Sequence, residues 1–281
     1  MPGSRIAVVA PACRIAPETA EAVAAIARSI YGPRARIDFH PQCFLSDGHF
    51  AGPDEARSAA FLEAANEPGF DAVWFARGGY GACRLLASIE GRLGPAARRK
   101  TYLGYSDLGA LLGLLYRDGV GSPVHGPMPN DIKRPGGEAA VHRALAFLID
   151  RDSAMIEPAA RSGRKVVAFN IMILVHLLAT PFAPDLSGHV LMLEEVSEHH
   201  YRIDRALCAI VSNPKTRHAA GLMLGRIADI PENDPAFGAT EEEIARSWCD
   251  RAGIPWLGRA DIGHDAANKI VPFGAAAIPF V

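Results

Sequence analysis

The amino-acid sequence predicts an α/β fold, with a parallel sheet and helices on both faces in the first half and a smaller mixed α/β unit in the second half. Two observations lead to this prediction. Short apolar, strand-like runs alternate with helix-like segments as far as about Leu115. After about Pro127 the alternation stops in loop-like sequence rich in proline and glycine, and a different pattern of elements follows.

Four short apolar runs predict the strands of the first half. They cover residues 6–10, 36–40, 72–76 and 101–105. The helices between and after them cover residues 18–30, 54–66, 82–89 and 106–115. Because successive strands are joined through helices, we expect them to run parallel to one another in a single sheet.

A helix over residues 141–149 is expected to end the first domain, which we place at residues 1–150. The polar segment of about 151–164 predicts a linker, and residues 165–281 predict a second domain. The elements expected there are helices at 170–178, 203–211 and 241–252, strands at 189–194 and 221–227, and short strands near Trp256 and Ile270.

The composition is that of an ordinary globular protein. Hydrophobic residues make up 49% of the 281 residues and charged residues 21%, which argues against disorder. A net charge of −2 gives no sign of a nucleic-acid partner. No signal peptide is recognisable, and the longest apolar stretch, residues 171–178, is too short to span a bilayer. We therefore expect a cytoplasmic protein without a membrane partner.

The five cysteines are scattered, and no two have the Cys-x-x-Cys spacing of a structural zinc site. An unpaired, widely spaced set of this kind indicates reduced thiols. The sequence also lacks the His-Glu-x-x-His pattern of many metal hydrolases. We expect neither a metal nor a cofactor.

Ser106 lies in the segment most suggestive of chemistry. An apolar strand runs through Gly104 to Ser106 and then into a helix, which places the hydroxyl at the carboxyl end of the sheet, where sites of α/β sheets lie. The arrangement is similar to a nucleophile elbow, although Gly109 comes one residue too late for Gly-x-Ser-x-Gly. The alternative is that Ser106 or Asp107 only caps the helix.

The segment Arg77-Gly78-Gly79-Tyr80-Gly81 also follows a buried strand and precedes a helix. Glycines in such a turn allow backbone N–H groups to come close to a ligand, and an arginine is suited to binding a carboxylate. A tight turn without a ligand, and a surface arginine, remain the alternatives.

A nucleophilic serine requires a base, and the base requires an acid that orients it. His264 and His125 both follow strand-like sequence and are candidates for the base, whereas His176 lies in an apolar helix and is expected in the core or at an interface. Glu194 and Glu195 end a buried strand and should point to opposite faces, so that one of them is available to the site. Spacing alone does not choose among these residues.

Several short motifs follow one another in an informative order: Val8-Val9-Ala10-Pro11, Arg77-Gly78-Gly79-Tyr80-Gly81, Gly104-Tyr105-Ser106-Asp107, His125-Gly126-Pro127-Met128, Leu193-Glu194-Glu195, Tyr201-Arg202-Ile203-Asp204-Arg205 and Gly263-His264. Together they resemble the LD-carboxypeptidase family of serine peptidases, over nearly the whole chain. This family includes murein tetrapeptide carboxypeptidases and microcin C immunity peptidases. The resemblance implies a Rossmann-like N-terminal domain, a smaller C-terminal domain and a site in the cleft between them.

The resemblance also implies a role for each residue of the site. Ser106 would be the nucleophile, His264 the general base and Glu194 the acid that orients the imidazole. The backbone N–H groups of Gly79 and Asp107 would form the oxyanion hole. The resemblance further implies that the protein is a homodimer.

Three more residues are expected to bind substrate: Arg77, Tyr80 and Asn170. Many relatives have Gly-Gly-Asn where this chain has Ala168-Phe169-Asn170. We expect the bulky Phe169 to narrow the substrate cleft or to redirect the neighbouring loop.

The implied activity is that of a serine carboxypeptidase, which hydrolyses an L,D-peptide bond and releases the C-terminal D-Ala of cytoplasmic murein tetrapeptides during murein recycling. One alternative is a microcin C immunity-type peptidase that cleaves an aminoacyl-nucleotide amide, with Tyr80, Phe169 or Trp256 as a platform for the base. Another is a binding protein without catalytic activity. In the first two cases the substrate is a small peptide, a muropeptide or a peptide–nucleotide conjugate.

Overall fold

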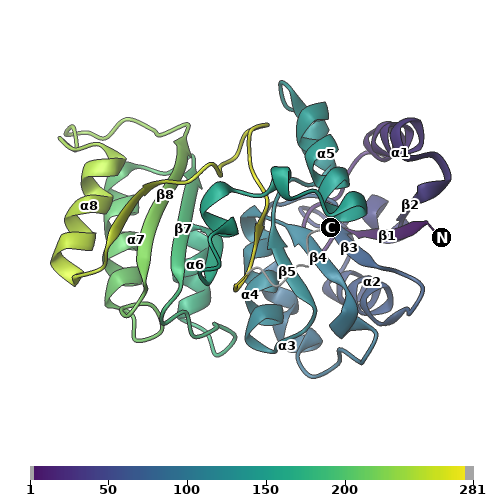
Figure 1. Ribbon diagram of the computed structural model, residues 1–281, viewed down its shortest axis with the longest axis horizontal. Helices are drawn as coiled ribbons and strands as arrows, with labels where there is room; N and C mark the ends of the chain where they lie inside the picture. The colour runs from purple at the N-terminus through teal and green to yellow at the C-terminus, as the bar shows by residue number, and fades with distance from the viewer. Residues whose placement is uncertain (1–2, 276–281) are drawn as a thin grey trace.

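The computed structural model describes residues 3–275, and its two sheets lie side by side, each with its own helices (Figure 1). The larger sheet has the strand order β10-β5-β4-β3-β1-β2 and the smaller sheet the order β6-β7-β8-β9. The strands of the larger sheet are β1 (Ser4–Val9), β2 (Ala35–Phe39), β3 (Ala72–Phe75), β4 (Thr101–Gly104), β5 (Ser122–His125) and β10 (Val271–Pro272). Those of the smaller sheet are β6 (Val166–Asn170), β7 (Val190–Val196), β8 (Gly221–Ala228) and β9 (Trp256–Arg259).

The helices connect the parallel strands and cover the sheets. They are α1 (Pro17–Tyr31), α2 (Asp54–Asn66), α3 (Leu86–Ile89), α4 (Gly109–Arg117), α5 (Gly137–Leu145), α6 (Ile171–Leu178), α7 (His200–Ser212) and α8 (Glu241–Ala252). Short 3-10 turns precede two of them, η3 (Ala82–Leu85) before α3 and η5 (Ser106–Leu108) before α4. The sequence predicted one continuous helix in each of these two places.

The α/β prediction is confirmed, because β1 to β5 pair with one another in parallel and β6 to β9 form a second parallel sheet. All four residues of β3 are buried, and Trp74 and Phe75 are fully inaccessible to solvent. Such continuous burial is expected where helices cover both faces of a parallel sheet.

Neither β5 nor β6 was given a residue range among the predicted strands, although His125, the last residue of β5, was expected after strand-like sequence. Pro123 in β5 has no N–H group to donate to a neighbouring strand, and a proline in a short run indicates a loop rather than a strand. The apolar run of β6 directly follows charged residues and directly precedes α6. No glycine or proline lies between the strand and the helix to mark a turn. Asn170 ends β6 and also caps α6.

The chain passes from the larger sheet to the smaller one and back again. Residues 151–165 lead to β6 through two 3-10 turns, and β10 later returns to pair antiparallel with β5. Gly274, just after β10, exchanges two backbone hydrogen bonds with Val166 of β6, at 3.1 and 2.8 Å. The segment between β9 and β10 therefore lies at the junction of the two sheets.

Helices α4 and α6 pack closely across the same junction. A Cβ atom on Gly113 of α4 would lie 2.4 Å from the Leu177 side chain of α6, and one on Gly109 would lie 3.1 Å from the ring of Phe169. Glycine thus allows the two helices to approach one another closely beside η5.

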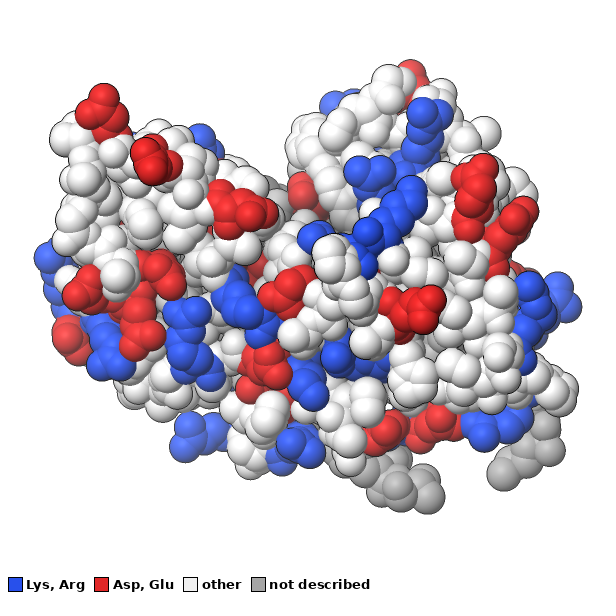
Figure 2. Space-filling view, turned by 90° about the horizontal axis from the view of Figure 1, so that it is seen from above, with Lys and Arg blue, Asp and Glu red and all other residues white. Residues whose placement is uncertain are grey.

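On the face seen from above, the two lobes are separated by a hollow, and positively and negatively charged side chains both occur on each lobe (Figure 2). Within residues 3–275, no helix has the length and apolarity that crossing a bilayer requires.

Candidate active site

Ser106 stands at the turn from β4 into η5, with a φ of 60°. A positive φ is strained for a residue other than glycine, at a cost of about 1–2 kcal/mol, and it is typical of nucleophile elbows. The backbone of the neighbouring turn comes very close, since a Cβ atom on Gly78 would lie 3.0 Å from Ser106 Cβ and 3.2 Å from its Oγ. The turn of residues 77–81 is therefore packed directly against Ser106.

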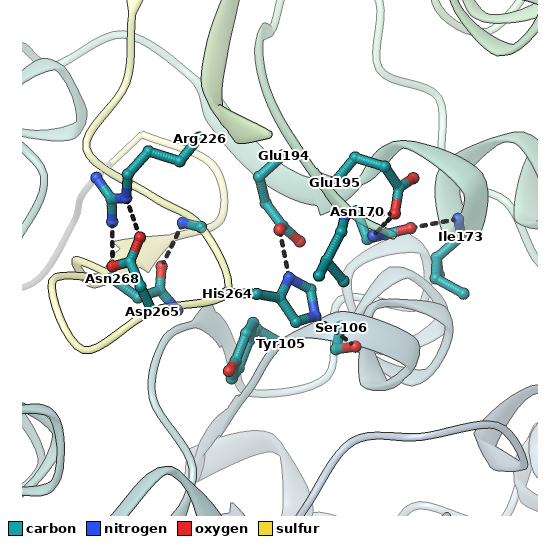
Figure 3. Close-up of polar contacts among 12 residues, drawn as sticks. Tyr105, Ser106, Asn170, Ile173, Glu194, Glu195, Arg226, His264, Asp265 and Asn268 are labelled. Atoms are coloured by element: carbon teal, nitrogen blue, oxygen red, sulfur yellow. Dashed lines mark hydrogen bonds and ion pairs between the residues drawn. The ribbon is translucent and has the colours of Figure 1, made fainter. Parts of the chain in front are cut away.

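A chain of hydrogen bonds joins Ser106 to two residues from the other half of the sequence (Figure 3). The Oγ of Ser106 lies 2.9 Å from Nε2 of His264, and Nδ1 of the same ring lies 2.5 Å from Oε2 of Glu194. The Glu194 side chain is fully buried and the His264 side chain is 7% exposed. The structure thus brings together the serine, the histidine and the glutamate, although 158 residues separate the serine from the histidine.

The environment of His264 favours a proton on its ring. Burial lowers the pKa of the imidazole, but the charge of Glu194 and its hydrogen bond to Nδ1 outweigh burial, so that the pKa is raised above the usual 6.5. The carboxylate also fixes the tautomer, because an Nδ1–H that donates to Glu194 leaves Nε2 free to accept a proton from Ser106.

The ring of Tyr105 packs against the imidazole of His264, a role that the sequence did not indicate. Its ring centroid lies 4.9 Å from that of His264 and 5.5 Å from that of His125, and its hydroxyl donates to Asp131 at 2.8 Å. The side chain is 1% exposed. Its position directly before Ser106, at the end of a buried strand, is the one signal in the sequence that pointed to this place.

Two backbone N–H groups near Ser106 come from turns without regular hydrogen bonding. Gly79 has a φ of +89°, and a Cβ atom there would lie 2.6 Å from Sγ of Cys13, so glycine is required. Among the described residues, its N–H donates to no backbone carbonyl. Asp107 is in the first turn of η5, where N–H groups have no acceptor within the helix.

Glu194 and Glu195 point to opposite faces of β7, as the alternation of a strand predicts (Figure 3). Glu195 accepts hydrogen bonds from the Asn170 amide at 2.5 Å and from the N–H groups of Met172 and Val196, at 3.0 and 2.9 Å. Burial raises its pKa to about 7, even though these hydrogen bonds favour the charged form. Glu195 is thus tied to the start of α6 rather than to His264.

Asn170 occupies a different place from the one expected. Its amide oxygen accepts from the N–H of Ile173 at 3.1 Å and its amide nitrogen donates to Glu195, so that it caps α6. The side chain is 6% exposed and both ends of the amide are engaged within the protein. In this structure it orders the helix beside the site and presents no free group to a substrate.

A cavity of about 470 Å³ adjoins the site between α4 and α6. Its lining is mainly apolar and includes Leu86, Ala110, Met172, Ile173, Leu177 and Phe182, with Asp107 next to the nucleophile. Burial raises the pKa of Asp107, and its own N–H group and three nearby histidines oppose this effect.

Tyr80 is half-exposed at the rim of the cavity. Arg77 is exposed, and one of its N–H groups donates to the carbonyl of Arg14 at 3.3 Å.

The competing histidines lie elsewhere. His125 is buried, and its Nε2 is bonded to Asn268 at 3.1 Å rather than to Ser106. Burial lowers its pKa to about 4, so it is a neutral packing residue of β5. His176 does not lie in the core, which was one of the two places expected for it, because its side chain is exposed and lines the cavity.

The expectations that Phe169 narrows the substrate cleft and that Trp256 offers a platform for a base were wrong. Phe169 is 1% exposed and packs against Gly109 and against Phe273, with 5.1 Å between the ring centroids, so it fills the junction of the two sheets and does not narrow a cleft. Trp256 lies on β9, at the far edge of the smaller sheet, where the Arg246 guanidinium stacks on it. Among the three aromatic residues considered as a platform, only Tyr80 lines the cavity. Among the described residues, no three His, Cys, Asp or Glu side chains are placed to share a metal ion.

Comparison with known proteins matches both halves of the chain to domains of one family. The LD-carboxypeptidase N-terminal domain matches residues 6–126 and the LD-carboxypeptidase C-terminal domain matches residues 163–278. A protein of Synechocystis sp. that carries a carboxypeptidase name is 31% identical over 82% of this chain and 76% of its own length. The murein tetrapeptide carboxypeptidase of Pseudomonas aeruginosa is 28% identical over 98% of this chain and 92% of its own.

Solved structures share the fold. Muramoyltetrapeptide carboxypeptidase from Oxalobacter formigenes superimposes with a TM-score of 0.80 at 23% identity, over 96% of this chain and 93% of that one. MccF in complex with glutamyl sulfamoyl guanosine superimposes with a TM-score of 0.76 at 17% identity, over 98% and 92% of the two chains.

Proposed function

Because the chain belongs to the LD-carboxypeptidase family, we propose that it is a serine carboxypeptidase that hydrolyses an L,D-peptide bond. Its proposed substrate is a murein tetrapeptide in the cytoplasm, from which it removes the C-terminal D-Ala during murein recycling. The observation that carries this proposal is the hydrogen-bonded chain of Ser106, His264 and Glu194, at 2.9 and 2.5 Å. The name of the Pseudomonas aeruginosa relative supports the choice of substrate.

In the first step, Ser106 Oγ attacks the carbonyl carbon of the scissile bond. His264 Nε2, 2.9 Å away, accepts the hydroxyl proton as the new C–O bond forms. Glu194 stabilises the resulting imidazolium through its hydrogen bond to Nδ1. The N–H groups of Gly79 and Asp107 donate to the oxygen that becomes negatively charged.

The tetrahedral intermediate then collapses. The C–N bond breaks, the proton on His264 passes to the leaving amine, and D-Ala departs while the remaining peptide stays esterified to Ser106. A water molecule next transfers a proton to Nε2 of His264 and attacks the ester carbonyl. The peptide is released with a free carboxylate and Ser106 recovers its proton.

A carboxypeptidase must also recognise the free carboxylate at the end of its substrate. Arg77 is exposed next to the turn that packs against Ser106, and no ion pair with an acidic side chain of the described residues engages it. An arginine fork binds a carboxylate through two parallel hydrogen bonds. We assign Arg77 this role, with Tyr80 beside it at the rim.

Mass spectrometry of a tetrapeptide ending in meso-diaminopimelate–D-Ala tests the proposal directly. The wild-type protein should remove one alanine, and Ser106→Ala should remove none over the same time. Ser162→Ala, in a 3-10 turn away from the site, is the matched control and should behave as the wild type. Intact tetrapeptide after incubation with the wild type would contradict the assigned substrate.

A nucleotide-conjugate peptidase is the second candidate, favoured by one observation. Tyr80 is half-exposed at the edge of the cavity, in contact with the rings of Phe50 and His49, and a base could stack on it. Thermal stabilisation by an adenosine monophosphate analogue but not by muropeptides would favour this candidate. Binding of the tetrapeptide without cleavage by the wild type would instead support a non-catalytic binding protein.

The homodimer implied by the resemblance is likewise a proposal. Size-exclusion chromatography with light scattering should give a mass close to twice 30.0 kDa. A monomer at the concentrations used for activity would contradict it.

A further inference from the structure

His264 belongs to neither a helix nor a strand. It lies in an irregular segment, residues 261–268, which links β9 to the short β10 at the junction of the two sheets. Because no regular backbone hydrogen bonding fixes this segment, the direction of the imidazole depends on other contacts. The Ser106–His264–Glu194 chain does not itself account for the path of the backbone.

Arg226 of β8 binds this segment on both sides of His264, and Figure 3 shows its bonds to Asp265. Its Nη1 donates to Asp261 at 2.5 Å, and its Nη2 donates to Asp265 at 2.9 Å. Its Nε donates to the second oxygen of Asp265, so that this pair is bidentate. The backbone N–H of Arg226 also donates to the carbonyl of Ile262 at 2.8 Å.

The backbones of β8 and of this segment are in direct contact. A Cβ atom on Gly263 would lie 2.9 Å from the Cβ of Arg226. A Cβ atom on Gly225 would lie 2.8 Å from the carbonyl oxygen of Ile262 and 2.9 Å from the Cβ of Glu194. The strand that carries Arg226 is thus pressed against both His264's neighbours and the acid that hydrogen-bonds to His264.

The other end of the segment is held from the N-terminal half of the chain. The amide oxygen of Asn268 accepts from the N–H of Gly263 at 3.2 Å and from Nε2 of buried His125 at 3.1 Å. Arg143 of α5 donates to the carbonyls of Ala266 and Asn268, at 2.7 and 3.2 Å. Arg226 is therefore the one side chain of β8 that pairs with this segment, opposite anchors from the larger sheet.

We propose that Arg226 is a positioning residue, whose guanidinium joins Asp261 and Asp265 and thereby holds His264 at hydrogen-bond distance from Ser106. The inference rests on the proposed function, because it requires His264 to act as the base. An arginine suits this task since its planar fork can bond two carboxylates at fixed angles, which a lysine cannot. A displacement of about 1 Å at such a site can lower the rate by about 100-fold.

The test compares Arg226→Met with Arg226→Lys and with a matched control. Arg246→Met removes an exposed ion pair on α8, where Arg246 lies 2.8 Å from Glu242, and should leave the kinetics unchanged. For Arg226→Met we expect kcat on the tetrapeptide to fall by about 100-fold, with KM within about threefold of the wild type. Arg226→Lys should recover only a small part of the rate.

A second comparison asks whether the loss acts through Asp265. If the two side chains act as one unit, Arg226→Met should lower kcat much less in the Asp265→Asn background than in the wild type. Independent, additive losses would contradict the proposed link between guanidinium, carboxylate and imidazole.

The rate of reaction with a fluorophosphonate gives a readout that does not depend on the natural substrate. In that reaction a bond forms between Ser106 Oγ and phosphorus, the phosphorus–fluorine bond breaks, fluoride leaves and His264 takes the serine proton. Arg226→Met should react about 100-fold more slowly than the wild type while keeping its thermal midpoint and circular dichroism.

The outcomes separate the two proposals. A wild type that is labelled at Ser106 but does not cleave the tetrapeptide would contradict the proposed substrate and leave the labelling rates to decide about Arg226. A folded Arg226→Met that is labelled at the wild-type rate would overturn the inference. If that variant does not fold, Asp261→Ala, which removes the carboxylate that accepts from Nη1 of Arg226, is judged by the same criterion. A wild type that is neither labelled nor active would contradict both proposals.

Discussion

Ser106 and His264 face each other across 2.9 Å, but the protein holds them in different ways. Ser106 stands on a strand–turn–helix unit whose backbone sets its φ of 60°, and neighbouring glycines allow close approach. His264 stands on an irregular segment, which is fixed by side chains from β8, β5 and α5. One side of the site depends on local backbone geometry and the other on long-range polar contacts.

The difference has a consequence for how each side fails. The nucleophile side should be sensitive to added atoms, because its backbone is already close-packed. The side that carries His264 should be sensitive to removed atoms, because residues 261–268 form no helix or strand and are held by side-chain contacts. Substitutions on the two sides should therefore differ in their effects, which we give in decreasing order of size.

Removing either of the two facing groups should give the largest loss. For Ser106→Ala and His264→Ala we expect kcat/KM to fall by about 10⁴-fold or more, and the double variant should be little worse than either single one, because the groups act as a unit. Steady-state cleavage of the tetrapeptide measures this. Near-normal turnover in either variant would exclude the assigned chemistry.

Adding one methyl group on the nucleophile side should give the next largest loss. In Gly78→Ala the new Cβ atom would lie 3.0 Å from Ser106 Cβ and must push the serine or its turn aside. We expect kcat/KM to fall by about 10-fold, because the serine has to move by a few tenths of an ångström and a shift of about 1 Å costs about 100-fold. Gly94→Ala is the control for kinetics, because a Cβ atom there would meet only the end of the Asn66 side chain, at 3.3 Å. Equal activity of the two variants would show that the close packing is unimportant.

Glu195 tests whether the two faces of β7 have separate roles. Its pKa is about 7 in the folded protein against an ordinary value of 4.5, so the folded state binds more protons between these pH values and stability falls as pH rises. Glu195→Gln should abolish roughly 3 kcal/mol of this loss in the free energy of unfolding between pH 4.5 and 8. Urea unfolding across this range is the measurement, with exposed Glu138→Gln as control. An unchanged pH dependence in Glu195→Gln would show that Glu195 is not the group responsible.

The smallest effect is expected at the cap of α6. Asn170→Ala removes the hydrogen bond from the N–H of Ile173 and also the one to Glu195, so the loss of stability is about 1–2 kcal/mol. Asn170→Ser keeps a capping oxygen and should recover part of the loss. If Asn170 instead binds substrate directly, Asn170→Ala would raise KM with little change in urea unfolding.

The sequence predicted those parts of the molecule that depend on local patterns. The expected bounds of two helices, residues 54–66 and 241–252, agree with α2 and α8, because acidic first turns, a Thr240–Glu243 capping box and a left-handed Gly253 mark their ends. The strand–turn–helix around Ser106 was visible for the same reason. Local sequence also predicted that Glu194 and Glu195 would face opposite ways.

Other features depend on contacts between distant segments and had no local signal. Spacing left His264 and His125 equally eligible, and only the fold shows that His125 is buried against Asn268. The sequence predicted Phe169 in the substrate cleft, but in the structure its ring packs against the glycines of α4. Arg226 and Tyr105 were not singled out, because their importance comes from what lies beside them in space.

The most direct test of the proposed roles of Ser106, His264 and Glu194 is the pH dependence of kcat/KM in the wild type and in Glu194→Gln. Activity requires a neutral imidazole, so it should decline as pH falls through a His264 pKa that lies above 6.5. Because Glu194 raises that pKa, Glu194→Gln should move the acid limb to lower pH and lower the plateau. An acid limb at the same pH in both proteins would show that Glu194 does not act on the catalytic base, and it would contradict the proposed Ser106–His264–Glu194 relay.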